Sequence, residues 1–100
     1  MESKLQAKCM KLAKVNKVLA RKVNAEARKG FPDLLLIFPV TGKTVYVEMK
    51  RPNGKGKLSK LQELELDRIR KQGASAYQCA SYDKFAEIIR THLITYYTSI

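Results

Sequence analysis

A run of five consecutive apolar residues at positions 34–38 is the sequence feature that most constrains the fold. This run is too short for a buried helix, but it is typical of a strand that is covered on both faces. Gly30 and Pro32 interrupt the chain just before it, so Asp33 stands at the beginning of the predicted strand. The sequence therefore predicts a core strand that opens with a carboxylate.

A second strand is predicted at 44–50, where β-branched and aromatic residues precede Glu48 and Lys50 and where Pro52 ends the pattern. Successive side chains of a strand point to opposite faces, so Glu48 and Lys50 share a face. If a short turn joins the two strands as an antiparallel hairpin, the start of the first lies beside the end of the second. This arrangement brings Asp33 next to Glu48 and Lys50.

The other elements are predicted from helical periodicity, caps and turn residues. They are a helix from Glu2 to about Leu19, a short strand within 18–29, a helix from the capping box of Ser59 and Gln62 to Gly73, a strand at 74–79 and a final helix capped by Ser81. This order predicts an α/β fold with a mixed central β-sheet flanked by helices and closed by one crossover. We expect a single domain over 1–100, because a chain of 100 residues is too short for a second core.

The first predicted helix carries two stripes. Its apolar residues recur at steps of three and four and are Leu5, Cys9, Leu12 and Val15. Its lysines follow a stripe of their own and are Lys4, Lys8, Lys11 and Lys14. The pattern predicts an amphipathic helix with a cationic face.

The formal net charge of +11 favours a polyanionic partner, and nucleic acid is the expected one. Charge alone leaves open a basic protein that touches ribosomal RNA or acidic lipid. The residues expected to contact the DNA backbone are Lys4, Lys8, Lys11, Arg51, Lys55, Lys57 and Lys60. The alternative for these residues is a solvated basic face.

Cysteine and histidine usage excludes two kinds of site. Cys9, Cys79 and His92 are the only residues of these types, which provides neither a disulfide framework nor the ligand spacing of a zinc site. All three are expected in the core, His92 alternatively at an interface. No unbroken apolar stretch follows the basic amino terminus, so neither a signal peptide nor a membrane span is predicted. A soluble protein of the cytoplasm is expected.

The predicted cluster has the composition of a site that hydrolyses phosphodiesters. The carboxylates of Asp33 and Glu48 are hard oxygen ligands for Mg²⁺ or Mn²⁺. The ammonium of Lys50 would orient a water or stabilise the charge of the transition state. The alternative is a surface ion pair between Glu48 and Lys50 beside an aspartate in a turn.

Three segments carry a resemblance to a known family: Gly30-Phe31-Pro32-Asp33-Leu34, Glu48-Met49-Lys50 and Ser59-Lys60-Leu61-Gln62. They resemble the signature of VRR-Nuc domains in the PD-(D/E)xK nuclease superfamily, and the likeness covers roughly 2–85. The resemblance implies a restriction-endonuclease-like fold, dependence on Mg²⁺ or Mn²⁺, and Asp33, Glu48 and Lys50 as the active centre.

The resemblance also implies two further site residues. Many members place a glutamate of the first helix near the metals, and Glu2 matches it; Glu26 is a weaker substitute. The alternative is that Glu2 only opposes the helix dipole. Gln62 matches a helix glutamine that would hold a metal-bound water or the scissile phosphate. The alternative for Gln62 is the capping-box hydrogen bond alone.

Stand-alone members of the family are often encoded by phages, resemble Holliday junction resolvases and act as homodimers. This chain is accordingly expected to cut branched DNA as a homodimer, in the host cytoplasm if a phage encodes it. Tyr96, Tyr97 and Ile100 form an apolar tail that would cover the core or pack against a second subunit. A non-catalytic basic nucleic-acid-binding module is the alternative. A ribosome-associated or phage structural protein would leave the acidic cluster without a purpose.

Overall fold

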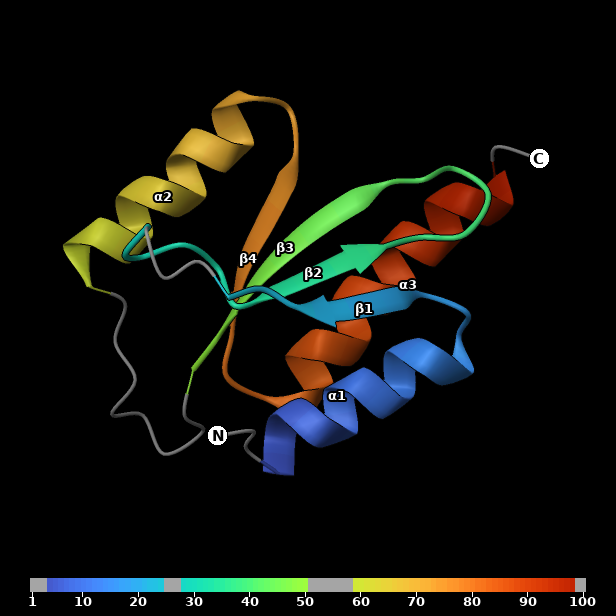
Figure 1. Ribbon diagram of the computed structural model, residues 1–100. Coiled ribbons are helices and arrows are strands. Elements are labelled where there is room, and N and C mark those ends of the chain that lie inside the picture. Colours follow the sequence, from blue (N-terminus) through green and yellow to red (C-terminus); the bar gives the residue numbers. More distant parts are fainter. Residues whose placement is uncertain (1–3, 25–27, 51–58, 99–100) are drawn as a thin grey trace.

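The computed structural model describes residues 4–24, 28–50 and 59–98, with side chains described as far as Leu93. The elements of this part of the chain are α1 (Lys4–Val15), β1 (Leu19–Lys22), β2 (Leu34–Ile37), β3 (Thr44–Met49), α2 (Lys60–Lys71), β4 (Ser75–Cys79) and α3 (Tyr82–Thr98). Figure 1 shows the strands side by side in the order β1-β2-β3-β4. The predicted α/β class and the order of elements are confirmed.

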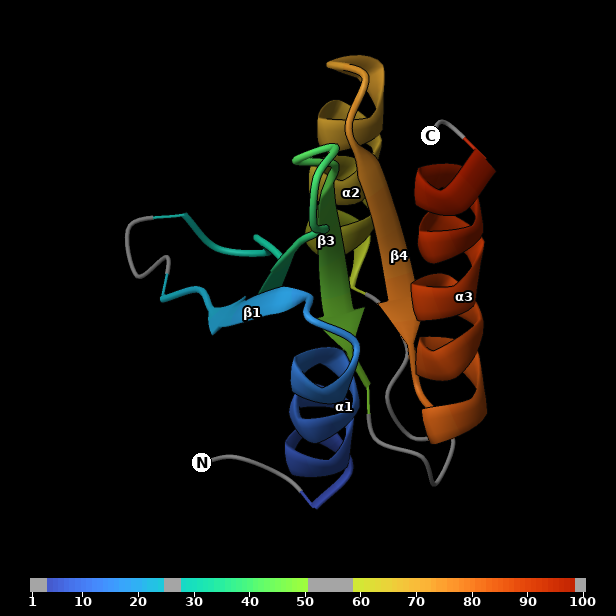
Figure 2. The ribbon, with the colours of Figure 1, turned by 90° about the vertical axis from the view of Figure 1, so that its right-hand side faces the viewer.

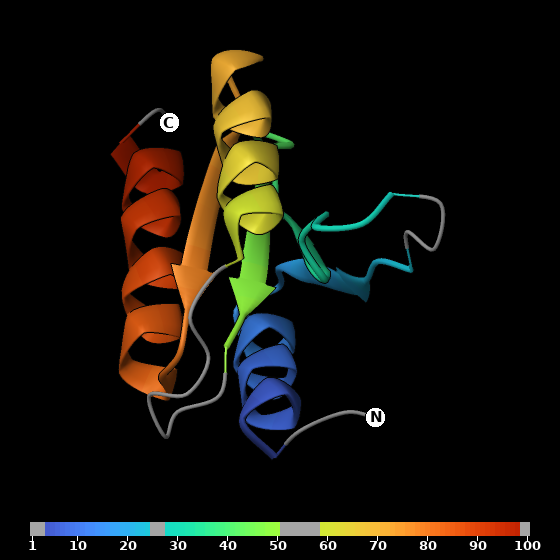
Figure 3. The ribbon, with the colours of Figure 1, turned by 90° about the vertical axis from the view of Figure 1, so that its left-hand side faces the viewer.

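The sheet combines antiparallel and parallel pairing. β1, β2 and β3 form an antiparallel meander, and β4 runs parallel to β3 after the crossover through α2. Helices α1 and α3 contact each other over one face of the sheet, while α2 lies on the other face (Figures 2 and 3). β1 is an edge strand, and its residues Leu19, Arg21 and Lys22 are exposed.

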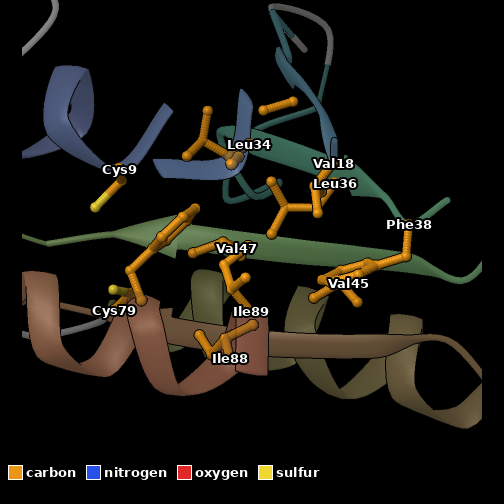
Figure 4. Packing of buried hydrophobic residues seen from close by; sticks show 13 residues of the cluster. Cys9, Val18, Leu34, Leu36, Phe38, Val45, Val47, Cys79, Ile88 and Ile89 are labelled. Atoms are coloured by element: carbon orange, nitrogen blue, oxygen red, sulfur yellow. The ribbon is translucent and has the colours of Figure 1, made fainter. Parts of the chain in front are cut away.

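The core lies between the sheet and the pair α1 and α3. Figure 4 shows Cys9 of α1, Val47 of β3 and Ile88 of α3 in this layer, and all three are buried. Cys79 is also buried, and both cysteines are free thiols. Burial raises the pKa of the Cys9 thiol to about 12, so it stays uncharged in the core. The prediction that the cysteines belong to the core is confirmed.

Helix α1 ends earlier than predicted and buries a different stripe. Lys17 adopts a left-handed conformation with φ of 64°, and the Val18 N–H donates to the Ala13 carbonyl at 2.9 Å. This Schellman-type ending turns the chain, so Val18 enters the core while Val15 remains 71% exposed. The residues that α1 buries are Gln6, Cys9 and Ala13, with Leu5 and Leu12 packed at the edge of the core. The prediction that the helix reaches Leu19 with Val15 on its apolar stripe was wrong.

The segment before β2 packs closely against the first turn of α2. Gly30 has φ of +84°, and a Cβ added there would lie 2.9 Å from Leu61 Cγ and 3.0 Å from the Leu61 carbonyl. Arg28 donates to the buried Glu65 at 2.8 Å, and Arg68 donates to the same oxygen at 2.8 Å. These contacts fix the segment that leads into Asp33 relative to α2.

Two leucines of α2 remain partly exposed to solvent. Leu61 is 41% exposed and Leu64 is 43% exposed, whereas Leu66 is buried. None of the helices in the described part of the chain has the length and apolarity needed to cross a lipid bilayer.

Replacement of Gly30 by alanine is expected to destabilise the protein by about 2 to 4 kcal/mol, because a left-handed alanine costs roughly 1 to 2 kcal/mol and overpacking adds a similar amount. The matched control is Gly42→Ala, since Gly42 has φ of +70° but nothing within 4 Å of the added Cβ. Urea unfolding of both variants measures the difference. Equal losses would show that contact with Leu61 does not constrain this segment.

Candidate active site

Asp33 and Glu48 face each other across two neighbouring strands. Leu34 of β2 pairs with Val47 of β3, so Asp33, just before β2, lies opposite Glu48. The Val23 N–H donates to the Asp33 carbonyl at 2.8 Å, which continues the β1–β2 pairing to this level. Asp33 Oδ1 accepts a 3.0 Å hydrogen bond from the Met49 N–H, which holds the aspartate against β3.

Glu48 lies on the α2 face of the sheet, because its neighbour Val47 points into the core on the other face. Its side chain is nearly inaccessible, with a relative exposure of 6%. Oε1 lies 3.4 Å from the Gln62 Nε2, whereas Oε2 is buried without a hydrogen-bond partner among the described residues. A buried carboxylate oxygen without a partner is costly, so its place in a native fold requires an explanation.

Burial disfavours the charged forms of both acids, and at Glu48 repulsion by Asp33 adds to this effect. Burial raises the pKa of Glu48 to about 7, the negative charge of Asp33 adds to the rise, and the positive charge of Lys50 opposes it. Burial also raises the pKa of Asp33, while backbone hydrogen bonds and Lys50 act against the rise. Among the described residues, Lys50 is the only cation that lowers the pKa values of the two acids.

Lys50 directly follows β3 and is held at both ends. Its N–H donates to the Cys79 carbonyl at 2.7 Å, which extends the pairing between β3 and β4 by one residue. Its ammonium donates to Gln62 Oε1 at 2.8 Å. The structure thus brings Asp33, Glu48 and Lys50 together at one end of the sheet, as the hairpin pattern predicts.

Gln62 joins this cluster to the start of α2. The Ser59 N–H donates to Gln62 Oε1 at 2.9 Å, and the Gln62 N–H donates to Ser59 Oγ at 3.2 Å, so the predicted capping box is present. The same Oε1 accepts from Lys50, and Nε2 faces Glu48. The two interpretations of Gln62 from the sequence therefore do not exclude each other, because one side chain caps the helix and contacts the cluster.

The other predicted site residues divide into two groups. Lys4, Lys8, Lys11 and Lys60 are exposed. Residues outside the described part of the chain are Glu2, Glu26, Arg51, Lys55 and Lys57. Figures 2 and 3 show α1 close to the end of β3, so its exposed lysines Lys4, Lys8 and Lys11 lie toward the end of the molecule that carries the acidic pair.

The two carboxylates fit a hard divalent cation. Among the described residues, no group of three or more histidines, cysteines and acids is arranged to hold a metal. Two carboxylates are nevertheless a sufficient protein ligand set for Mg²⁺, because this ion keeps several waters and is completed by substrate phosphate. The unpartnered Oε2 of Glu48 beside Asp33 is the feature that such an ion would satisfy.

Gln78 of β4 is a polar residue beside the acidic pair that the sequence pattern did not indicate. The register of the parallel pair places Gln78 beside Glu48, so Asp33, Glu48 and Gln78 lie in a row across β2, β3 and β4. Gln78 is exposed, whereas its strand neighbours Tyr77 and Cys79 face α3 and the core. The alternation within the predicted strand at 74–79 was a usable signal, but the sequence did not reveal which residue would lie beside Glu48.

His92 belongs to the opposite face of the sheet. It is 8% exposed, its Nε2 lies 2.9 Å from the Tyr77 hydroxyl, and its ring contacts Phe38. Burial lowers the pKa of His92, so it is neutral at pH 7. Its assignment as a satisfied buried histidine is confirmed.

Comparison with known proteins agrees with the geometry. The VRR-NUC domain family model matches residues 2–83. A solved structure described as a VRR_NUC domain superposes with a TM-score of 0.75 at 31% identity, covering 86% of this chain and 90% of that chain. A second, described as a VRR_NUC domain protein, gives 0.64 at 13% identity over 91% and 89% of the two chains, which shows a shared fold. No curated protein is significantly similar in sequence. The chain belongs to the VRR-NUC domain family of nucleases.

Proposed function

We propose that this nuclease is a metal-dependent DNA endonuclease in which Asp33 and Glu48 hold Mg²⁺ or Mn²⁺ and Lys50 and Gln62 complete the active site. The observation that carries the proposal is the buried, unpartnered Oε2 of Glu48 directly beside Asp33. Uncompensated acids are tolerated in a fold when a ligand completes them.

A bound divalent ion would neutralise the developing charge on the phosphate and lower the pKa of a water. Lys50 contributes a positive charge. Its ammonium donates a 2.8 Å hydrogen bond to Gln62 Oε1, which fixes the charge near Glu48. A fixed ammonium stabilises charge that develops in the transition state without first having to reorganise. Gln62 also ties Lys50 to the N-terminus of α2, and the positive end of a helix dipole favours phosphate nearby.

We further assign the enzyme to branched DNA, with a preference for structures of the Holliday-junction type, and to a homodimer. Resolution of a four-way junction needs two incisions, which two copies of one active site supply. The net charge of +11 supports contact with DNA backbones. A role for Glu2 in the metal shell, a cytoplasmic location, a phage origin and a single domain over 1–100 remain predictions.

The second candidate is a non-catalytic module that binds nucleic acid through its basic face. The observation in its favour is that the described residues offer two acids rather than three near one another. Metal-dependent cleavage separates the two functions. It is measured on four-way, flapped, nicked and linear DNA with Mg²⁺, Mn²⁺ or EDTA, and light scattering determines the oligomeric state.

Asp33→Asn, Glu48→Gln and Lys50→Ala are each expected to lower the cleavage rate at least about 100-fold, because each removes charge that acts on the metal or the transition state. DNA binding should persist. The matched control is Glu63→Gln, an exposed acid in the first turn of α2. Full cleavage by any of the three variants would remove that residue from the site.

Glu48 also predicts a pH dependence of the metal-free protein. Its pKa is about 7 when folded and returns to its ordinary value of 4.5 on unfolding, so the folded state binds more protons between these values. Stability from this group is fully present below pH 4.5 and is lost as pH rises through 7. Asp33, the facing acid, acts in the same direction.

The glutamine of Glu48→Gln cannot ionise, so this variant does not lose that stability. The free energy of unfolding of the variant minus that of the wild type should therefore rise by up to about 3 kcal/mol from pH 5 to pH 8. Urea titrations in EDTA measure this difference. Mg²⁺ should stabilise the wild type more at pH 8 than at pH 5, because the ion binds the charged acids. A difference that does not change with pH would contradict the raised pKa.

Gln78→Ala is expected to lower kcat by roughly tenfold or more with little change in KM, the effect of losing a hydrogen bond to a charged group in the transition state. The reason is its place beside Glu48 in the register. Gln72→Ala, at the exposed C-cap of α2, is the control. Cleavage at the same rate by both variants would show that Gln78 does not take part in the reaction.

A further inference from the structure

We infer that a hollow between α1 and the first turn of α3 binds an unpaired nucleobase of the substrate. The branched DNA of the proposed function would then be preferred when a nucleotide beside the cleavage point is unpaired, in a flap or at an opened branch point. This inference rests on the proposed function for the identity of the ligand.

The hollow combines exposed apolar side chains with cations. It has a volume of about 500 Å³ and is lined by Lys8, Lys11, Leu12, Val15 and Tyr82. Val15 is 71% exposed and Tyr82 is 41% exposed. A valine and a tyrosine that remain open to solvent in one hollow gain from being covered by a flat apolar ligand.

The charges around the hollow specify the ligand further. Helix α1 contains no acidic residue, and Lys8 and Lys11 form no ion pair with the residues that the structure describes. A second hollow on the other side of Lys11 is edged by Lys14 and Arg21. The hollow offers both kinds of group that a nucleotide needs. The base can stack on the ring of Tyr82, and the phosphate can pair with the ammonium groups of Lys8 and Lys11.

The Tyr82 side of the hollow lies toward the end of the sheet that carries the acidic pair. The Cys79 carbonyl accepts the Lys50 N–H at 2.7 Å, and Tyr82 begins α3 just after this point. Figures 2 and 3 show the first turn of α3 and helix α1 near the ends of β3 and β4.

The two sites nevertheless lie on opposite faces of the sheet, because Glu48 faces α2 and the hollow lies between α1 and α3. A DNA strand that reaches both must bend around this end of the sheet. A paired and stacked strand resists such a bend, whereas a single unpaired nucleotide follows it. Stacking on Tyr82 would not select a particular base, so the preference would be for structure and not for sequence.

The test uses metal-free protein in EDTA, so that binding is measured without cleavage. The probe is a duplex with a short single-stranded flap whose first unpaired base is 2-aminopurine, and the reference is the blunt duplex. The chain has no tryptophan, so the fluorescence of the probe is observed without interference. We expect quenching on binding and an affinity for the flap about 5- to 100-fold above that for the blunt duplex.

Tyr82→Ala should remove the quenching and the preference for the flap, while Tyr82→Phe should keep both because the ring remains. Val15→Glu should weaken flap binding through repulsion of the phosphate. An abasic flap should bind wild type and Tyr82→Ala equally well. Quenching that persists in a folded Tyr82→Ala protein, or equal losses on flap and blunt DNA, would overturn the inference.

The same samples with Mg²⁺ or Mn²⁺ separate this inference from the proposed function. If wild type and Tyr82→Ala cleave flapped and blunt DNA at the same rate, the base site is contradicted and the nuclease function is supported. If flap binding depends on Tyr82 but no cleavage occurs with either metal, the metal-dependent nuclease is contradicted and the base-binding site is supported.

Discussion

The amide of Gln62 is the interaction on which the geometry of the site depends. Its oxygen accepts hydrogen bonds from the Ser59 N–H and from the Lys50 ammonium, and its nitrogen faces Glu48. The start of α2, the end of β3 and the acidic pair are therefore joined through one side chain. A helix that shifted or frayed at this end would also release Lys50, so the integrity of the cap and the position of the cation are coupled.

Contacts outside the acidic pair hold the two acids in place. Asp33 is fixed by the Met49 N–H and by the pairing with β1, and the segment before it is packed on α2 through Gly30 and Arg28. The fold thereby supports two acids whose pKa values burial raises. A locally unfavourable arrangement, supported by good packing around it, is the usual signature of a site built for a ligand.

The sequence was sufficient where geometry is local. A short hairpin turn fixes an antiparallel register, so Asp33 could be placed beside Glu48, and the capping box placed Gln62 at a helix start. Gln78 could not be placed because the register of a parallel pair is set by the docking of the crossover helix. The stripe on α1 was misjudged because Lys17, a residue without the glycine signal for a left-handed turn, ends the helix.

The exposed edge strand β1 limits how two copies of the chain can associate. Its outward residues include Arg21 and Lys22, and bringing two such edges together would place like charges in contact and desolvate them. Continuation of the sheet from one copy into another through β1 is therefore disfavoured. The partly exposed leucines of α2, Leu61 and Leu64, carry no such electrostatic penalty. A symmetric dimer formed through helices would leave the lysines of α1 free to contact DNA and would not extend the sheet from one copy to the next.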